Sequence, residues 1–142
     1  MIKNIKPPKA LVFLNSVGQI DNLTGKLQFH GIKTESLHGT DKKMGRKQVM
    51  DDYRSGKLRI LIASDIAARG LQMDGITYIF NMDIPETSKD YLHRAGRTGR
   101  NGLKGIVISL ATIKEIPLLR KMEKELKIKI GNKVFFEGKI TD

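Results

Sequence analysis

Ala-Leu-Val-Phe-Leu, residues 10–14, is a continuous apolar run that is followed at once by Asn15 and Ser16. An apolar run of this length is typical of a strand buried on both faces of a parallel sheet. The polar pair stands where such a strand gives way to a helix. The stretch therefore predicts the first strand of an α/β domain.

The same alternation continues along the chain. Further strands are expected over residues 32–37, 58–63, 77–82 and 105–110. Helices are expected up to residue 29 and over residues 42–54, 66–69, 87–95 and 113–126. Strands separated by helices favour right-handed βαβ units and a mostly parallel sheet flanked by helices. The run 32–37 is the more polar, which favours a place near the sheet edge.

The two ends of the chain differ from this pattern. Residues 1–8 are lysine-rich and end in Pro7-Pro8, which predicts an extended connector outside the core, a linker from a preceding N-terminal domain. Residues 9–127 form the expected domain. Residues 128–142 are a C-terminal extension for which a hairpin, an added strand and a tail all remain open.

Composition narrows the classes of partner. The 26 Lys and Arg against 15 Asp and Glu give a net charge of +11, which favours a polyanion such as nucleic acid. With no Trp, three Tyr and five Phe, backbone contacts are favoured over base stacking.

The absence of cysteine excludes disulfides and thiolate metal sites. The histidines His30, His38 and His93 lack metal-ligand spacing, so no metal site is expected. No apolar run is long enough to cross a membrane and no leader is evident, so we expect a soluble, cytoplasmic protein without a membrane partner.

A second informative stretch is Tyr-Leu-His-Arg-Ala-Gly-Arg-Thr-Gly-Arg-Asn, residues 91–101. Arg94, Arg97 and Arg100 are three residues apart, with Gly96 and Gly99 between them. Two glycines so close together are costly inside a helix, at roughly 1 kcal/mol each. We expect a helix that ends near Gly96, and then a turn that aims the last two arginines in one direction. Guanidinium groups suit phosphate oxygens; a solvated basic helix end is the alternative.

Three turns are expected at the carboxyl ends of strands, where open parallel sheets bind ligands. They are residues 15–18, His38-Gly39-Thr40 and Ser64-Asp65. Helix N-termini at such turns offer free N–H groups to phosphates. The alternative is that Ser16, Thr40, Ser64 and Asp65 serve only as helix caps.

These stretches carry a family resemblance. Residues 91–101 resemble motif VI of the DEAD-box RNA helicases, of the form His-Arg-x-Gly-Arg-Thr-Gly-Arg. Residues 10–16 resemble motif IV, and Ser-Asp-Ile-Ala-Ala-Arg-Gly at 64–70 resembles motif V, usually Thr-Asp-x-Ala-x-Arg-Gly. The matches follow the family's order from residue 10 to about 110. The resemblance implies a RecA-like three-layer α/β domain, the second of the two in a helicase core.

The resemblance also implies residue roles. Arg97 and Arg100 would be catalytic arginine fingers that reach the γ-phosphate of ATP. Arg69, His93 and Arg94 would couple the two domains. RNA would be bound by Asn15, Ser16, Gly39, Thr40, Ser64, Asp65 and Gly70.

Three positions depart from the family pattern. Gln72 stands where relatives usually have an Asp on the ATP ribose; its amide can still bond a hydroxyl, so it stays a nucleotide-binding candidate. Lys43 stands where the family often has Gln. Ser64 in place of Thr keeps the hydroxyl.

The sequence has no Gly-x-x-x-x-Gly-Lys-Ser/Thr and no Asp-Glu-Ala-Asp. We therefore expect ATP and its magnesium to be held by a missing N-terminal RecA-like domain of the same protein, and this domain alone to be inactive. The expected function is the C-terminal half of an ATP-dependent RNA helicase that unwinds short duplexes. The alternative is a non-catalytic RNA-binding module, and a motor on DNA or protein is a weaker third.

Overall fold

Strand β1 (Ala10–Phe13) lies at the centre of a five-stranded sheet in the computed structural model, which describes residues 1–38 and 43–142. All four of its residues are buried, as the apolar run predicts. It pairs in parallel with β3 (Ile60–Ala63) on one side and β4 (Tyr78–Asn81) on the other, with Ala10 opposite Ile60 and Tyr78. Its full burial follows from neighbours on both edges and helices on both faces.

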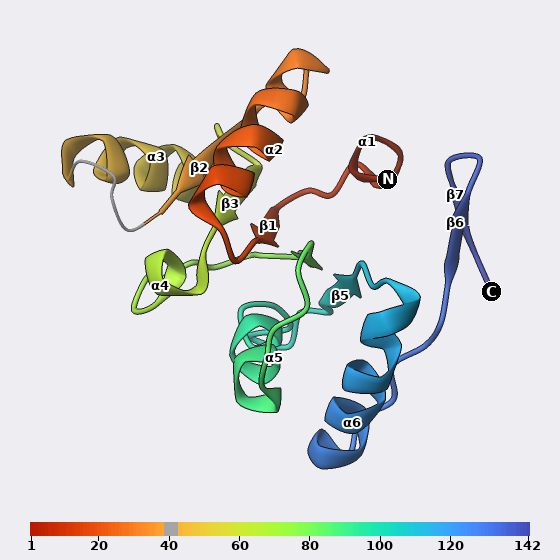
Figure 1. Cartoon of the computed structure of the whole chain (residues 1–142). Helices are drawn as coiled ribbons and strands as arrows, with labels where there is room; N and C mark the ends of the chain where they lie inside the picture. The colour runs from red at the N-terminus through yellow and green to blue at the C-terminus, as the bar shows by residue number, and fades with distance from the viewer. Residues whose placement is uncertain (39–42) are drawn as a thin grey trace.

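The sheet order is β2-β3-β1-β4-β5, and every pairing is parallel. Strand β2 (Thr34–Leu37) forms one edge, as its polar residues predict, and β5 (Ile106–Ser109) forms the other. The predicted α/β fold with a parallel sheet is confirmed (Figure 1).

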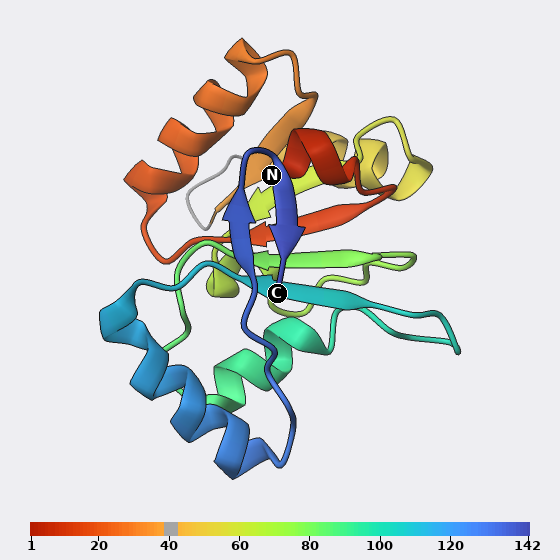
Figure 2. The ribbon, with the colours of Figure 1, turned by 90° about the vertical axis from the view of Figure 1, so that its right-hand side faces the viewer.

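Alternate residues of the strands enter two apolar layers. Ala10 and Val12 pack with α2 (Val17–Phe29) and α1 (Ile2–Ile5). Leu11 and Phe13 pack with α3 (Lys43–Ser55) and α4 (Asp65–Ala68) on the opposite face. Helices α5 (Ser88–Ala95) and α6 (Ile116–Leu126) pack against each other beside β5, and a 3-10 turn η1 (Ile113–Glu115) precedes α6 (Figures 1 and 2). None of the helices in the described ranges combines the length and apolarity needed to cross a membrane.

The chain ends differ from the sequence prediction. Instead of an extended connector, residues 2–5 form α1, and Ile2 and Ile5 pack against the sheet. Ile2 and Ile5 are three residues apart, so one helical turn places both on the same side, where they can be buried. The sequence prediction gave more weight to the neighbouring prolines and so expected an extended segment.

At the other end, a hairpin joins β6 (Val134–Phe136) to β7 (Lys139–Thr141). Its turn is Glu137-Gly138, both with positive φ, so the hairpin is the alternative that the structure shows. Asn4 Nδ2 donates a hydrogen bond to the Gly138 carbonyl at 2.7 Å, so the two termini meet in front of the sheet (Figure 2).

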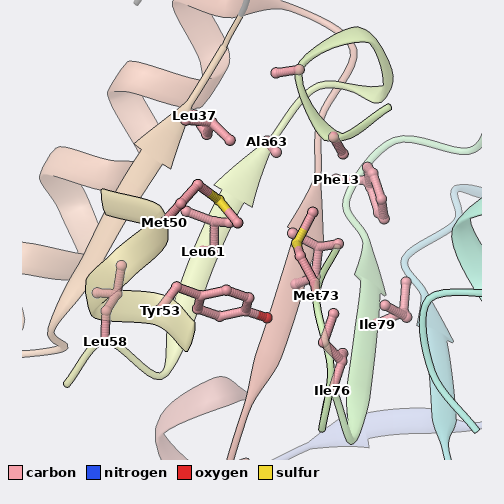
Figure 3. Close-up of a cluster of buried hydrophobic side chains, with 13 residues drawn as sticks. Phe13, Leu37, Met50, Tyr53, Leu58, Leu61, Ala63, Met73, Ile76 and Ile79 are labelled. Atoms are coloured by element: carbon pink, nitrogen blue, oxygen red, sulfur yellow. The ribbon is translucent and has the colours of Figure 1, made fainter. Parts of the chain in front are cut away.

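Helix α3 turns Met50 and Tyr53 onto the sheet over Leu61, with Met73 beside them (Figure 3). The Tyr53 hydroxyl donates to the Ala10 carbonyl at 3.0 Å, and burial raises the pKa of this phenol. The Lys9 ammonium lies 4.6 Å from the centre of the Tyr53 ring. Tyr53 thus ties α3 to the start of the central strand.

Replacing Tyr53 by Phe should lower the free energy of unfolding by about 1 kcal/mol, because a buried hydrogen bond to β1 is lost while the ring remains. Tyr78→Phe is the matched control, since the Tyr78 ring stacks on Phe80 and its hydroxyl has no hydrogen-bond partner within the described residues. Urea unfolding of both variants measures the difference. Equal losses would contradict the role given to the Tyr53 hydroxyl.

Candidate functional site

Arg94, in the last turn of α5, is buried at the carboxyl ends of the central strands, with 1% of its surface exposed. Its Nε and Nη2 donate to the two carboxylate oxygens of Asp65 at 2.8 and 2.7 Å. Nη2 also donates to Asn15 Oδ1 at 2.8 Å, and Nη1 donates to the Asp83 carbonyl at 2.7 Å and to Asn81 Oδ1 at 3.4 Å. One side chain therefore joins the segments that follow β1, β3 and β4.

A buried guanidinium is stable only when its charge is paired and its N–H groups are satisfied. Here the pair is the Asp65 carboxylate, and the Phe13 ring lies 5.0 Å from the guanidinium carbon. Asn15 is fixed in turn, because its backbone N–H donates to Asp83 Oδ2 at 2.8 Å. The sequence prediction placed Arg94 at a domain interface. Its donors are used within this chain, so any influence on another domain would be indirect.

Asn81 and Asp83 were missed by the sequence analysis. Asn81 is the last residue of β4, and Asp83 follows the strand much as Asn15 and Ser16 follow β1. Polar residues after a buried strand were the signal used for three other turns, and the same signal would have found Asp83 but not Asn81, which lies within the strand.

Arg97 is half-buried and holds the segment after α4. Its Nη1 donates to the Leu71 carbonyl at 2.7 Å and its Nη2 to the Ala68 carbonyl at 2.8 Å. Burial and, secondly, the charge of Arg100 lower the pKa of Arg97 from its ordinary value. Both terminal nitrogens of Arg97 are therefore already hydrogen-bonded within the chain.

Three further side chains hold the same segment. Arg46 of α3 donates to the Ala67 carbonyl at 2.7 Å, and Arg54 donates to the Gln72 carbonyl at 3.2 Å. Thr98 donates to the Ile76 carbonyl. Within the described part of the chain, residues 67–76 have no neighbouring strand that could donate hydrogen bonds to their carbonyls. Side chains of α3 and of the motif around Arg97 supply these hydrogen bonds instead.

The predicted helix end near Gly96 and the turn after it are confirmed, but Arg97 and Arg100 do not share one environment as the prediction implied. Helix α5 begins after Thr87, whose hydroxyl accepts from the Asp90 N–H, and it ends at Gly96. A side chain at Gly96 would come within 3.2 Å of the Leu92 carbonyl, and Gly99 has a φ of 69°. Beyond this turn Arg100 is exposed, with its Nε bonded to the Gly96 carbonyl at 2.7 Å.

A surface hollow of about 570 Å³ lies between α4, the loop after it and α5. It gathers most of the residues that the sequence predicted: Asp65, Arg69, Gly70, Gln72, His93, Arg94, Arg97 and Arg100. Asp90 also lines it, and Asp65 is already paired with Arg94. The remaining cations, Arg69, Arg97 and Arg100, make this hollow suited to an anion.

Three predicted residues within the described ranges, Asn15, Ser16 and Ser64, do not line this hollow. The Ser64 hydroxyl accepts from the Ala67 N–H at 3.2 Å, so the capping interpretation holds for it. Ser16 sits at the N-cap of α2 but makes no side-chain cap bond, and it is exposed. Gly39 and Thr40 lie outside the described residues. In the described ranges, no cluster of three or more His, Asp or Glu side chains could hold a metal ion.

Known proteins of similar sequence belong to one family. The helicase conserved C-terminal domain family matches residues 1–102. The chain is 40% identical over 134 residues to the DEAD-box ATP-dependent RNA helicase CshC of Bacillus cereus, covering 94% of this chain and 34% of that protein. This chain spans about a third of the length of the curated relatives that it matches.

Solved structures give the same result for the fold. The Escherichia coli DEAD-box protein SrmB, bound to the regulator RraA, superposes with a TM-score of 0.84 at 31% identity, over 91% of this chain and 76% of that one. Saccharomyces cerevisiae Dbp5 bound to RNA and ADP–BeF3 superposes with a TM-score of 0.79 at 29% identity, over 86% of this chain and 33% of that one.

Replacing Arg94 by Met should lower the free energy of unfolding by about 1–3 kcal/mol, because the acceptors on Asn15, Asn81 and Asp83 would lose their donor, while the partly exposed Asp65 carboxylate can be solvated. Arg100→Met is the matched control, since Arg100 is exposed, and its effect should stay within about 0.5 kcal/mol. Both are measured by urea unfolding of this chain. A loss for Arg94→Met no larger than the control's would show that the network is not a structural centre.

Proposed function

This chain belongs to the DEAD-box RNA helicases, as their helicase C-terminal domain, and from that premise we propose that it brings Arg97 and Arg100 to ATP held by a separate N-terminal domain. At the same time, the domain binds RNA through the sugar-phosphate backbone. In the whole protein, ATP and RNA together close the two domains and force short duplexes apart. The domain alone does not hydrolyse ATP, and the N-terminal domain holds the magnesium.

The observation that carries this proposal is that Arg97 and Arg100 line one hollow with Arg69 and His93. A phosphoryl group under transfer develops negative charge, which a guanidinium from a second domain stabilises. Arg100 is exposed, and its two terminal nitrogens have no hydrogen-bond partner in the described ranges. Of the two proposed fingers, it is therefore the one that is free to contact a ligand outside this chain.

Arg97 takes part differently. Its terminal nitrogens are bonded to the Ala68 and Leu71 carbonyls, so it reaches a phosphate only by giving up part of that contact. The exposed Gln72 lines the hollow next to these carbonyls and offers an amide to a ribose hydroxyl. Nucleotide binding and the position of this loop are thus coupled through one arginine.

The RNA contacts are proposed at the carboxyl ends of the strands. Ser16 has an unused hydroxyl in an exposed turn, and Gly70 has a φ of 73° and no side chain to shield its backbone. Asn15, Ser64 and Asp65 support these turns through the contacts described above. Gly39 and Thr40 are part of the same proposal. Dbp5, which has this fold, has been solved bound to RNA and ADP–BeF3, which supports it.

The domain division belongs to the same proposal: residues 1–8 link to the N-terminal domain, 9–127 form the RecA-like domain and 128–142 extend it. A cytoplasmic location fits the lack of cysteine. The second candidate function is a non-catalytic RNA-binding module, which the basic composition alone would satisfy.

The test is ATP turnover by this chain joined behind the N-terminal domain of a DEAD-box relative. Turnover should occur only in the joined protein and should rise with RNA. Arg100→Ala should lower it by a factor of about 10³ or more while RNA binding persists, because the finger acts on the transition state. Lys104→Ala removes an exposed cation four residues along the chain and should leave turnover unchanged.

If the joined protein folds correctly and binds RNA but does not turn over ATP, the non-catalytic RNA-binding module is favoured. Equal loss of turnover and RNA binding in Arg100→Ala would remove the finger assignment.

A further inference from the structure

A second hollow, also of about 570 Å³, lies at the opposite end of the sheet from the candidate site. It is formed by α1, by the end of α2 and by the residues that lead into β2 and β3. Five cations line it: Lys3, Lys6, Lys33, Lys57 and Arg59. We call this the basic hollow.

The charges of the basic hollow are not balanced by the chain. No Asp or Glu lines it. All five cations are exposed, and across the described ranges none of the five side chains has an ion pair or a hydrogen bond. The contrast with the candidate site is clear, since Arg94 and Arg97 there are bonded to Asp65 and to carbonyls.

Helix ends explain only part of this charge. The C-termini of α1 and α2 lie here, and each favours one nearby cation. Five like charges around one concave surface repel one another, and low-dielectric walls focus their field on an anion. The hollow therefore has the electrostatic form of a site for several phosphate groups.

An exposed aromatic side chain beside the hollow narrows the ligand. Phe29, the last residue of α2, is 87% exposed. Its ring meets the ring of His30 edge to face with centres 5.5 Å apart, and His30 lines the hollow. Cations that track phosphates next to an aromatic face that stacks a base are the combination used to bind single-stranded nucleic acid.

We propose that the basic hollow is a second binding site for single-stranded RNA, in which the five cations contact phosphates and Phe29 stacks on a base. The site goes beyond the proposed function and needs no ATP. Four-residue strands at about 3.3 Å per residue separate it from the candidate site by roughly 13 Å or more. It thus holds a different part of the RNA from the strand at the carboxyl ends.

The test is fluorescence anisotropy of a labelled oligouridine RNA titrated with this chain over a series of salt concentrations. The double variant Lys57→Gln, Arg59→Gln should weaken binding and reduce the slope of log affinity against log salt by about 1.4, since each single-strand phosphate contact contributes about 0.7. The control is Lys114→Gln, Lys124→Gln, which removes the same charge from exposed positions in η1 and α6. The control should leave the slope unchanged.

Phe29→Ala should weaken binding roughly fivefold or more without a change of slope, because it removes a stacking surface and no charge. Equal slopes in the two double variants would overturn the proposal and leave only a general effect of net charge. A slope change with no effect of Phe29→Ala would also overturn it, in favour of a site for phosphate groups without a base.

The two results that would overturn the second site leave the proposed function intact, because ATP turnover of the joined protein depends on the candidate site. Loss of turnover in Arg100→Ala with normal behaviour of the Lys57 and Arg59 variant would keep the function and remove the second site.

Discussion

The buried charge of Arg94 is the constraint on which the arrangement at the carboxyl ends of the strands, the proposed ligand-binding end of this domain, depends. A parallel sheet leaves the carboxyl ends of its strands open, and the turns that follow them have no ladder to fix them. Here one guanidinium bonds to Asp65, Asn15 and Asp83, which follow three different strands. Replacing such a network by apolar residues need not cost stability, so its value lies in the fixed geometry. The turns are held in one arrangement because no donor of Arg94 can be left unsatisfied.

The three arginines of the motif form a series from the inside of the domain outward. Arg94 is wholly bonded within the chain, Arg97 is half-buried and bonded to two carbonyls, and Arg100 is exposed with only its Nε bonded. The helix that carries the first one ends at Gly96, and the turn at Gly99 directs the last one to solvent. The outer arginine, which is free for a ligand, is the one that suits the proposed finger role.

Much of the fold could be predicted because the deciding signals are local. The apolar runs of β1 and β3 are buried strands, and the polar β2 is an edge strand, as expected. The helix α1 was missed because its stability comes from contacts with the sheet, not from its own four residues. The burial of Arg94 was missed for the same reason, since nothing in the spacing of the arginines says which of them points inward. Whether a serine caps a helix also depends on fine geometry, and Ser64 does so while Ser16 does not.

The domain thus carries cations at both ends of its sheet. Arg94 and Arg97 at one end are bonded within the chain, whereas the five cations of the basic hollow have no ion pair or hydrogen bond among the described residues. If Arg94 positions the turns at the carboxyl ends, these turns should loosen when its planar fork is lost. Amide hydrogen exchange of this chain and of Arg94→Lys, which keeps the charge but loses the fork, measures this. Exchange should become faster in residues 14–18 and 65–72 while β1 and β3 stay protected. Unchanged exchange in those turns, or equal loss of protection throughout the sheet, would contradict this role of Arg94.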